Sequence, residues 1–150
     1  MRKVYKVLIA TLITPVALVI LLFSIICIWA WVDNETNPER IHSIALNASI
    51  SKFKDVDSDD IDYLLKHLDK MLSKDIDTLD EILEETNRAK QADLIMDLEE
   101  KLHTELIRDA CIVLSVDIVK AKMSPTQRKD LDKAEKKLSS LKRRLALLKF

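Results

Sequence analysis

Residues 7–32 read VLIATLITPVALVILLFSIICIWAWV, and this stretch decides how the rest of the chain is interpreted. Its 26 residues carry no charge, and a helix of that length can cross a hydrocarbon core of roughly 30 Å. A cleaved signal peptide has a shorter apolar core that ends in small residues. This run instead ends near Trp29 and Trp31, and Trp favours the membrane interface. The sequence therefore predicts an uncleaved transmembrane anchor over residues 7–32, with both Trp side chains at one interface.

The charges on either side of the anchor predict its orientation. Residues 1–6 carry three basic residues, whereas Asp33, Glu35 and Glu39 follow the span. Because basic flanks stay in the cytoplasm, we expect a cytoplasmic N-terminus over residues 1–6. Residues 33–150 are then periplasmic or otherwise extracytoplasmic, and the chain is a single-pass protein of the inner or plasma membrane.

The composition favours helices over strands. The sequence has no Gly and only three Pro, although strands and tight hairpins commonly use Gly in their turns. Leu, Ile, Lys, Asp and Glu dominate, as they do in coiled coils and long helices. We expect an all-α protein, in which the anchor is followed by an extended antiparallel helical hairpin or bundle with coiled-coil tendency.

Charge divides the exported part into two regions. Residues 33–119 carry 22 acidic and 10 basic residues, a net charge of −12, whereas residues 120–150 carry 3 acidic and 11 basic residues, a net charge of +8. We therefore distinguish an acidic helical region, 33–123, from a basic C-terminal helix, 124–150. A basic tail can fold back on the acidic region, pair with another copy, or face an anionic surface.

Local signals place the helix boundaries. Asn37-Pro38 predicts a helix start, with Asn as cap and Pro in the first turn, and the apolar spacing extends over 38–53. Ser58 is the expected cap of the next helix, and a long element is expected over 78–123. Ser124-Pro125-Thr126-Gln127 predicts a capped start of the last helix, with Ser124 and Gln127 forming a capping box.

The last helix carries two features that suggest interaction. Apolar residues recur at spacings of three and four, which indicates a heptad seam, and basic residues flank it. We expect the seam to pack on the acidic helices or on another copy, and the basic face to remain available to an anionic membrane surface. The seam residues are Leu131, Ala134, Leu138, Leu141, Leu145 and Leu148, and the basic surface comprises Lys136, Lys137, Lys142, Arg143 and Arg144.

Two sequence patterns invite a metal interpretation. Asp55-x-Asp57-x-Asp59 begins like a calcium loop, but Asp60 and Lys66 stand where such a loop needs Gly and Glu. An acidic linker with helix-capping carboxylates is the better interpretation. Glu99 and His103 are four residues apart and would share a helix face. They are the weak candidate for a transition-metal site, with a solvated His on an acidic face as the favoured alternative, and we expect no cofactor.

The sequence contains no recognisable catalytic motif. Ser and Thr residues stand at caps or on polar faces, without a His in any familiar arrangement, so we expect no enzyme. The basic tail lacks interleaved aromatics, which argues against nucleic-acid binding. Cys111 lies in an apolar stretch and is expected to be a buried side chain, with an intermolecular disulfide as the alternative.

Two resemblances suggest a setting in the cell envelope. Met123-Ser124-Pro125-Thr126-Gln127 resembles the L-T-P-x-Q repeat of the periplasmic Spy/CpxP family, which implies a helical-hairpin dimer acting as a chaperone or as a stress or metal sensor. Met replaces Leu and Ser replaces Thr, and a second copy of the repeat is absent. The layout also looks like that of phage inner-membrane spanins and single-span holins, in which one N-terminal span precedes a helical region.

These observations lead to one hypothesis and an alternative. The chain is expected to be a non-enzymatic, membrane-anchored helical scaffold or interaction protein of the cell envelope, and the resemblance to spanins and holins implies a role in phage lysis. Its expected partners are the lipid bilayer and either a second copy or another envelope protein. The alternative is a stress or metal sensor or chaperone of the Spy/CpxP kind.

Overall fold

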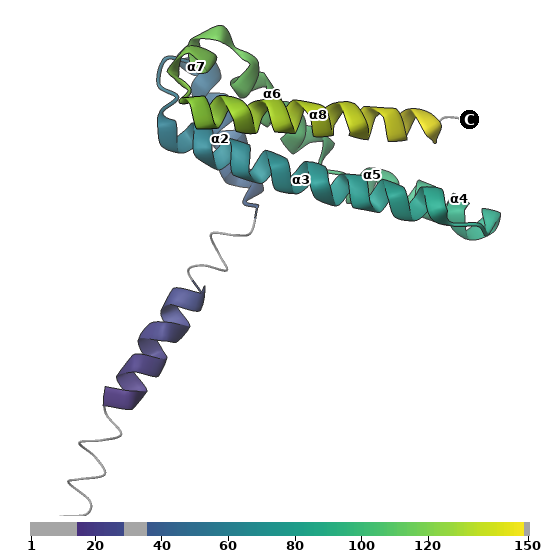
Figure 1. Cartoon of the computed structure of the whole chain (residues 1–150), viewed down its shortest axis with the longest axis horizontal. Helices are drawn as coiled ribbons and strands as arrows, with labels where there is room; N and C mark the ends of the chain where they lie inside the picture. Colours follow the sequence, from purple (N-terminus) through teal and green to yellow (C-terminus); the bar gives the residue numbers. More distant parts are fainter. Residues whose placement is uncertain (1–14, 29–35, 149–150) are drawn as a thin grey trace, which may run out of the picture. The chain divides into compact units, whose positions relative to one another are not determined.

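The computed structural model describes residues 15–28 and 36–148 and divides the chain into two compact units, Met1–Thr36 and Asn37–Phe150. In the first unit, residues 15–28 form a helix (Figure 1). Within the described part of the chain, no helix combines the length and apolarity that a membrane crossing requires. The predicted anchor, 7–32, extends past the described helix at both ends, and Trp29 and Trp31 lie outside the described residues.

The second unit is all-helical over its described residues, which confirms the predicted all-α class. Its two longest helices, α3 (Ser58–Glu84) and α8 (Pro125–Leu147), lie side by side (Figure 1). The shorter elements are α2 (Pro38–Ile50), α4 (Arg88–Met96), α5 (Leu98–Lys101), α6 (Thr104–Ser115) and α7 (Asp117–Lys122).

Helices α3 and α8 run parallel, so the predicted antiparallel arrangement is wrong for this pair. Near the start of both helices, Gln127 Nε2 donates to Asp62 Oδ1 at 2.7 Å, and near their ends Arg144 pairs with Asp80. Both contacts join residues about 65 positions apart. The reason is the return path of α4 to α7, which brings the chain back to the beginning of α3 before α8 starts (Figure 1).

The same register holds for the shorter helices. His42 of α2 contacts Asp109 of α6 through its ring Nδ1. Further along, Lys122 Nζ donates to the carbonyl of Val56 at 2.9 Å. Residues 38–84 and residues 104–147 therefore follow a similar route and lie against each other with their equivalent parts aligned. The long helix follows one short helix, α2, in the first case and two short helices, α6 and α7, in the second.

One hydrophobic core joins the two halves. Burial of these side chains is the main stabilising contribution, about 25 cal/mol for each Å² of apolar surface removed from water. The core takes residues from α2, α3, α6, α7 and α8, and its completely covered members include Ile41, Leu64, Leu72, Ala110, Val113, Leu114 and Val119.

The predicted helix starts have mixed outcomes. Asn37 caps α2 by accepting from Arg40 N, and Ser124 and Gln127 form the predicted capping box of α8. Asp57 rather than Ser58 caps α3, because its carboxylate accepts from Asp60 N at 2.8 Å. This capping role also agrees with the linker interpretation of the Asp55-Asp57-Asp59 pattern.

The long element expected over 78–123 is wrong. The chain leaves the helical conformation at Glu85, Leu102 and Val116, whose ψ angles are 119°, 143° and 135°. Asn87 then caps α4 by accepting from the amides of Ala89 and Lys90. No Gly or Pro marks these breaks in the sequence. Beyond the last two breaks, α6 and α7 bury their apolar residues in the core, among them Ala110, Val113 and Val119.

Candidate functional site: the two charged flanks of the C-terminal helix

The predicted seam of α8 is covered by the chain itself. Three seam residues, Leu131, Ala134 and Leu141, are buried. The other three, Leu138, Leu145 and Leu148, are half-buried and pack against the same core. The acidic helix α3 is the principal neighbour of α8, so this side of the tail needs no second copy to bury it. Self-association through the seam stays a prediction.

One flank of α8 is neutralised by acidic residues of α3. Lys137 Nζ lies 2.7 Å from Asp69 Oδ1 and donates to Ser73 Oγ at 2.8 Å, and Lys133 Nζ lies 3.7 Å from the same carboxylate oxygen. Arg144 and Asp80 form a two-point pair in which Nη2 lies 3.1 Å from Oδ2. Part of the basic tail is therefore engaged by the acidic region of the same chain.

The ion pair between Asp80 and Arg144 shifts the pKa values of both side chains. The hydrogen bond from Arg144 lowers the pKa of the Asp80 carboxyl, and the same bond raises the pKa of Arg144. Both side chains stay partly open to water, where solvent screening weakens the contribution of an ion pair to stability. The pair thus specifies the register between α3 and α8 more than it stabilises the fold.

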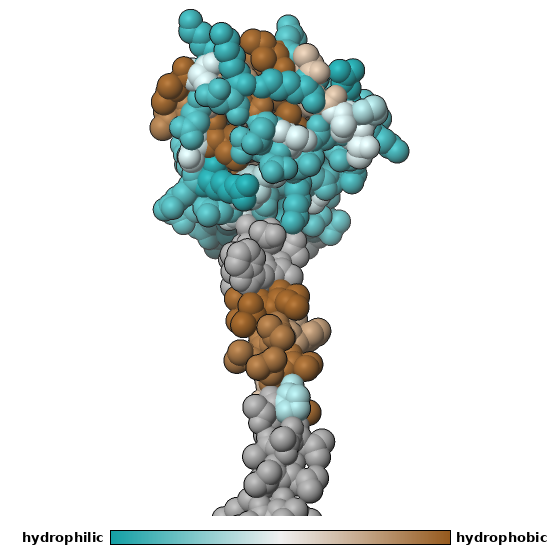
Figure 2. Space-filling view, turned by 90° about the vertical axis from the view of Figure 1, so that its left-hand side faces the viewer, coloured by the Kyte–Doolittle hydropathy of each residue, from teal (hydrophilic) through white to brown (hydrophobic). Residues whose placement is uncertain are grey.

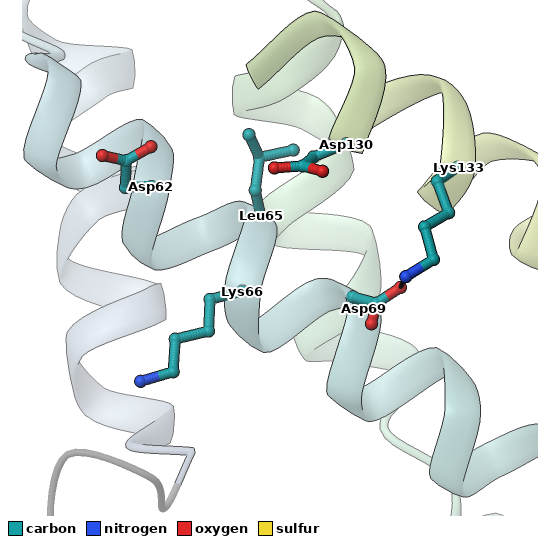
Figure 3. Close-up of a pocket in the computed structure, with 6 residues that line it drawn as sticks. All are labelled: Asp62, Leu65, Lys66, Asp69, Asp130 and Lys133. Atoms are coloured by element: carbon teal, nitrogen blue, oxygen red, sulfur yellow. Dashed lines mark ion pairs between the residues drawn. The ribbon is translucent and has the colours of Figure 1, made fainter. Parts of the chain in front are cut away.

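A small pocket lies between the first halves of α3 and α8 (Figure 3). Its volume is about 240 Å³. Figure 3 shows Lys133 reaching across from α8 to Asp69, whereas the Lys66 side chain extends away from α8. Three acidic and two basic residues line the pocket, so the lining carries no single sign of charge that would attract an ion. The lining residues are Asp62, Leu65, Lys66, Asp69, Asp130 and Lys133.

The other flank of α8 is open to solvent. Lys136, Lys142 and Arg143 are exposed, whereas Lys137 and Arg144 are partly covered. The predicted basic surface therefore splits into two residues that bind α3 and three that project into solvent. Sequence spacing alone does not separate these groups, because the division depends on which side of α8 contacts the acidic helix.

The weak metal candidate, Glu99 with His103, does not form a shared helix face. Glu99 lies in α5, and His103 precedes α6 in a non-helical conformation. His103 Nδ1 lies 2.6 Å from Asp75 Oδ1, and its backbone N–H donates to Asp75 Oδ2 at 2.9 Å. His103 is thus a partner of a carboxylate and not a solvated side chain on an acidic face. Among the described residues, no group of three or more potential ligands surrounds a metal position.

Asp75 is the residue that sequence reasoning missed. Its side chain is completely buried, and a buried carboxylate is costly unless hydrogen bonds or opposite charges satisfy it. Asp75 fixes the start of α6 to the middle of α3 through two contacts with His103. Its only sequence signal is an acid within the apolar face of a helix, between Leu72 and Leu79.

Cys111 lies beside an apolar pocket between α6 and α8. The pocket has a volume of about 130 Å³ and includes Leu68, Leu114 and Leu138. Cys111 is half-buried as a free thiol, and burial raises its pKa. Because the thiolate is the reactive form, this environment slows oxidation of Cys111. An intermolecular disulfide stays untested.

Comparison with known proteins identifies no relative of the chain. No protein-family model, no curated protein and no solved structure matches the chain. The resemblances to Spy/CpxP proteins and to phage spanins and holins therefore stay hypotheses.

Proposed function

We propose that the protein is a non-enzymatic scaffold or interaction protein of the cell envelope, tethered to the inner membrane by residues 7–32. Its N-terminus lies in the cytoplasm, and its helical unit lies on the other side of the membrane. The open flank of α8 supplies an interaction surface, while the neutralised flank holds that helix on the body of the unit.

One observation carries the proposal. Every residue from 15 to 28 is exposed, and large apolar side chains occupy all sides of that helix. A helix that is apolar all round requires a partner protein or a lipid environment. With the uncharged run continuing in sequence from 7 to 32, a bilayer is the environment that best fits the length. The exposed apolar residues are Val16, Leu18, Val19, Ile20, Leu21, Leu22, Phe23, Ile25, Ile26 and Ile28.

Membrane extraction tests the tether. The full chain should stay in the membrane pellet after alkaline carbonate treatment, and external protease should digest its helical unit in spheroplasts. Leu21→Arg with Leu22→Arg should release it, because each Arg near the centre of a span costs about 2.5–3.5 kcal/mol. The matched control, Leu46→Arg with Ile50→Arg, places the same charges on α2 and should remain in the pellet. Carbonate release of the unmodified chain would contradict the proposal.

A second candidate, the chaperone form of the Spy/CpxP hypothesis, has one observation in its favour. Leu46 and Ile50 of α2, Ile112 of α6 and Ile118 of α7 are exposed apolar residues. Figure 2 shows hydrophobic side chains among the hydrophilic ones on the face of the helical unit that it draws. Apolar surface of this kind can hold an unfolded client. The chaperone candidate predicts that the full chain slows aggregation of a denatured test protein and that Leu46→Arg with Ile50→Arg abolishes this effect.

A further inference from the structure

The second half of α8 is basic without interruption. After Glu135 the sequence contains no acidic residue, while six basic residues follow. Lys137 and Arg144 are occupied by α3. The exposed residues Lys136, Lys142 and Arg143 therefore give the open flank a positive charge that no acid further along the helix offsets.

The exposed side chains form a line along the helix. Lys129, Lys136 and Arg143 are each seven residues apart, which is almost two whole helical turns, so they share one side of α8. All three are exposed, and so is Asp132, which lies between Lys129 and Lys136 on this side and offsets part of the charge at that end of the line. At a rise of about 1.5 Å per residue the line is about 21 Å long. Leu147, which is 68% exposed, follows four residues after Arg143 and continues the same edge.

The chemistry of this edge differs from that of a helix-binding surface. Where α8 binds α3, the ion pairs flank a buried apolar seam that includes Leu131 and Leu141, as helix pairing requires. The open flank has no such seam, since exposed Ser139 and Ala146 lie among its basic residues. Positive charge with an isolated apolar side chain is instead the pattern of helices that rest on anionic bilayers.

We propose that the edge formed by Lys129, Lys136, Arg143 and Leu147 docks on a bilayer surface that contains anionic phospholipid. The basic side chains bind headgroup phosphates, and Leu147 enters the interface. This inference rests on the proposed tether, which holds the helical unit at high effective concentration near lipid. Each basic side chain at an anionic surface favours the docked state about fivefold.

A lipid-quenching experiment on the full chain tests the docking. The chain, with Cys27→Ser, Cys111→Ser and Ala146→Cys, carries a fluorophore at position 146 and is placed in nanodiscs that contain spin-labelled lipid. One set of discs is phosphatidylcholine, and in the other set phosphatidylglycerol replaces part of it. Quenching should be stronger in the anionic discs and should disappear at high salt, because screening weakens exposed charges.

Charge reversal supplies the decisive comparison. Lys136→Glu with Arg143→Glu should reduce the ratio of docked to undocked protein on the order of 25-fold or more. The control, Lys74→Glu with Lys101→Glu, changes the net charge equally at exposed positions outside α8 and should keep the quenching.

The outcomes separate the docking from the tether. Equal quenching in both kinds of disc, or quenching that survives Lys136→Glu with Arg143→Glu, overturns the docking while the chain remains in the discs. The first result would direct the search to an acidic protein partner. A chain absent from both kinds of disc overturns the tether and the docking that rests on it.

Discussion

Residues 38–84 and residues 104–147 follow a similar route but make the turn before the long helix differently. In the first half, Lys52 and Phe53 adopt positive φ angles of 52° and 65° between α2 and α3. In the second half, the short helix α7 makes the connection, and the capping box of Ser124 and Gln127 starts α8. A chain without Gly either accepts left-handed residues, at about 1–2 kcal/mol each, or spends more residues on the turn.

The two halves also contribute differently to their junction. The first half supplies most of the acids, including buried Asp75, whereas the second supplies the bases and Gln127. Opposite charges along two parallel helices favour one register over others, because a shifted register separates the pairs. Variants can change either the contacts between the two halves or the turn within the first half. We expect their effects on the free energy of unfolding to differ in size.

The largest effect is expected at the buried junction. Asp75→Ala removes the acceptor for both His103 contacts and should lower the free energy of unfolding by about 3 kcal/mol, as expected for a broken buried pair. The measurement is urea unfolding of the detergent-solubilised chain, followed by circular dichroism. Asp77→Ala, at an exposed position on the same helix, should change stability by less than about 0.5 kcal/mol. Equal stability of the two variants would contradict a structural role for Asp75.

A smaller loss is expected where the starts of α3 and α8 meet. Buried Gln127 accepts from Ser124 N at 2.9 Å and donates to Asp62 Oδ1 at 2.7 Å. Gln127→Ala removes these two bonds together with the bond from Nε2 to Ser58 Oγ at 3.1 Å, and should cost about 2 kcal/mol, since each hydrogen bond contributes roughly 0.5–1.5 kcal/mol. Thr126→Ala, at an exposed neighbouring position, serves as control in the same unfolding measurement. If Gln127→Ala lowers the free energy of unfolding no more than Thr126→Ala does, the hydrogen bonds of Gln127 do not stabilise the contact between α3 and α8.

A substitution in the turn between α2 and α3 should raise the stability of the protein. Lys52→Gly relieves a positive φ and should raise the free energy of unfolding by roughly 0.5 kcal/mol, because the relief slightly exceeds the added freedom of Gly in the unfolded chain. Lys54→Gly relieves no positive φ and should instead destabilise the protein. Thermal melting of both variants distinguishes the two cases. A lower melting temperature for Lys52→Gly would contradict the claim that the positive φ of Lys52 is strained.

The smallest effect concerns pH. Arg144 lowers the pKa of Asp80 below its ordinary value of 3.8, so the pair stabilises the protein fully above that value. The contribution is lost as the pH falls through the lower pKa of the folded state. Asp80→Asn should therefore flatten the decline of stability below pH 3.8 and leave a small constant loss at neutral pH. Melting temperatures measured across acidic pH provide the test, and an unchanged acid profile would argue against the pair.

Much of the helical unit could be predicted because its signals are local. The caps at Asn37 and Ser124 depend on residues no more than three positions away, and the structure confirms both. The breaks at Glu85, Leu102 and Val116 could not be predicted so well. Asn87 was a usable cap signal, but the breaks at Leu102 and Val116 have no Gly or Pro and depend on how α6 and α7 fit against the core.

The candidate site was predicted in part. The sequence identified the basic residues of α8, but not that Lys137 and Arg144 face acids while Lys136 and Arg143 face solvent. The sequence pattern groups His103 with Glu99 because it predicts one continuous helix through both residues. The start of α6 at Thr104 removes that geometry and brings His103 to Asp75 instead.

The sequence by itself determined the all-helical class, the capped starts of α2 and α8, the uncharged run over 7–32 and the separation of acidic from basic regions. Helical periodicity and capping act over a few residues and can be recognised in the chain order. Only the tertiary structure decided that α3 and α8 run parallel, that Asp75 is buried against His103, and which flank of α8 stays open. These features join residues 28 or about 65 positions apart, and the path of the chain between them sets their geometry.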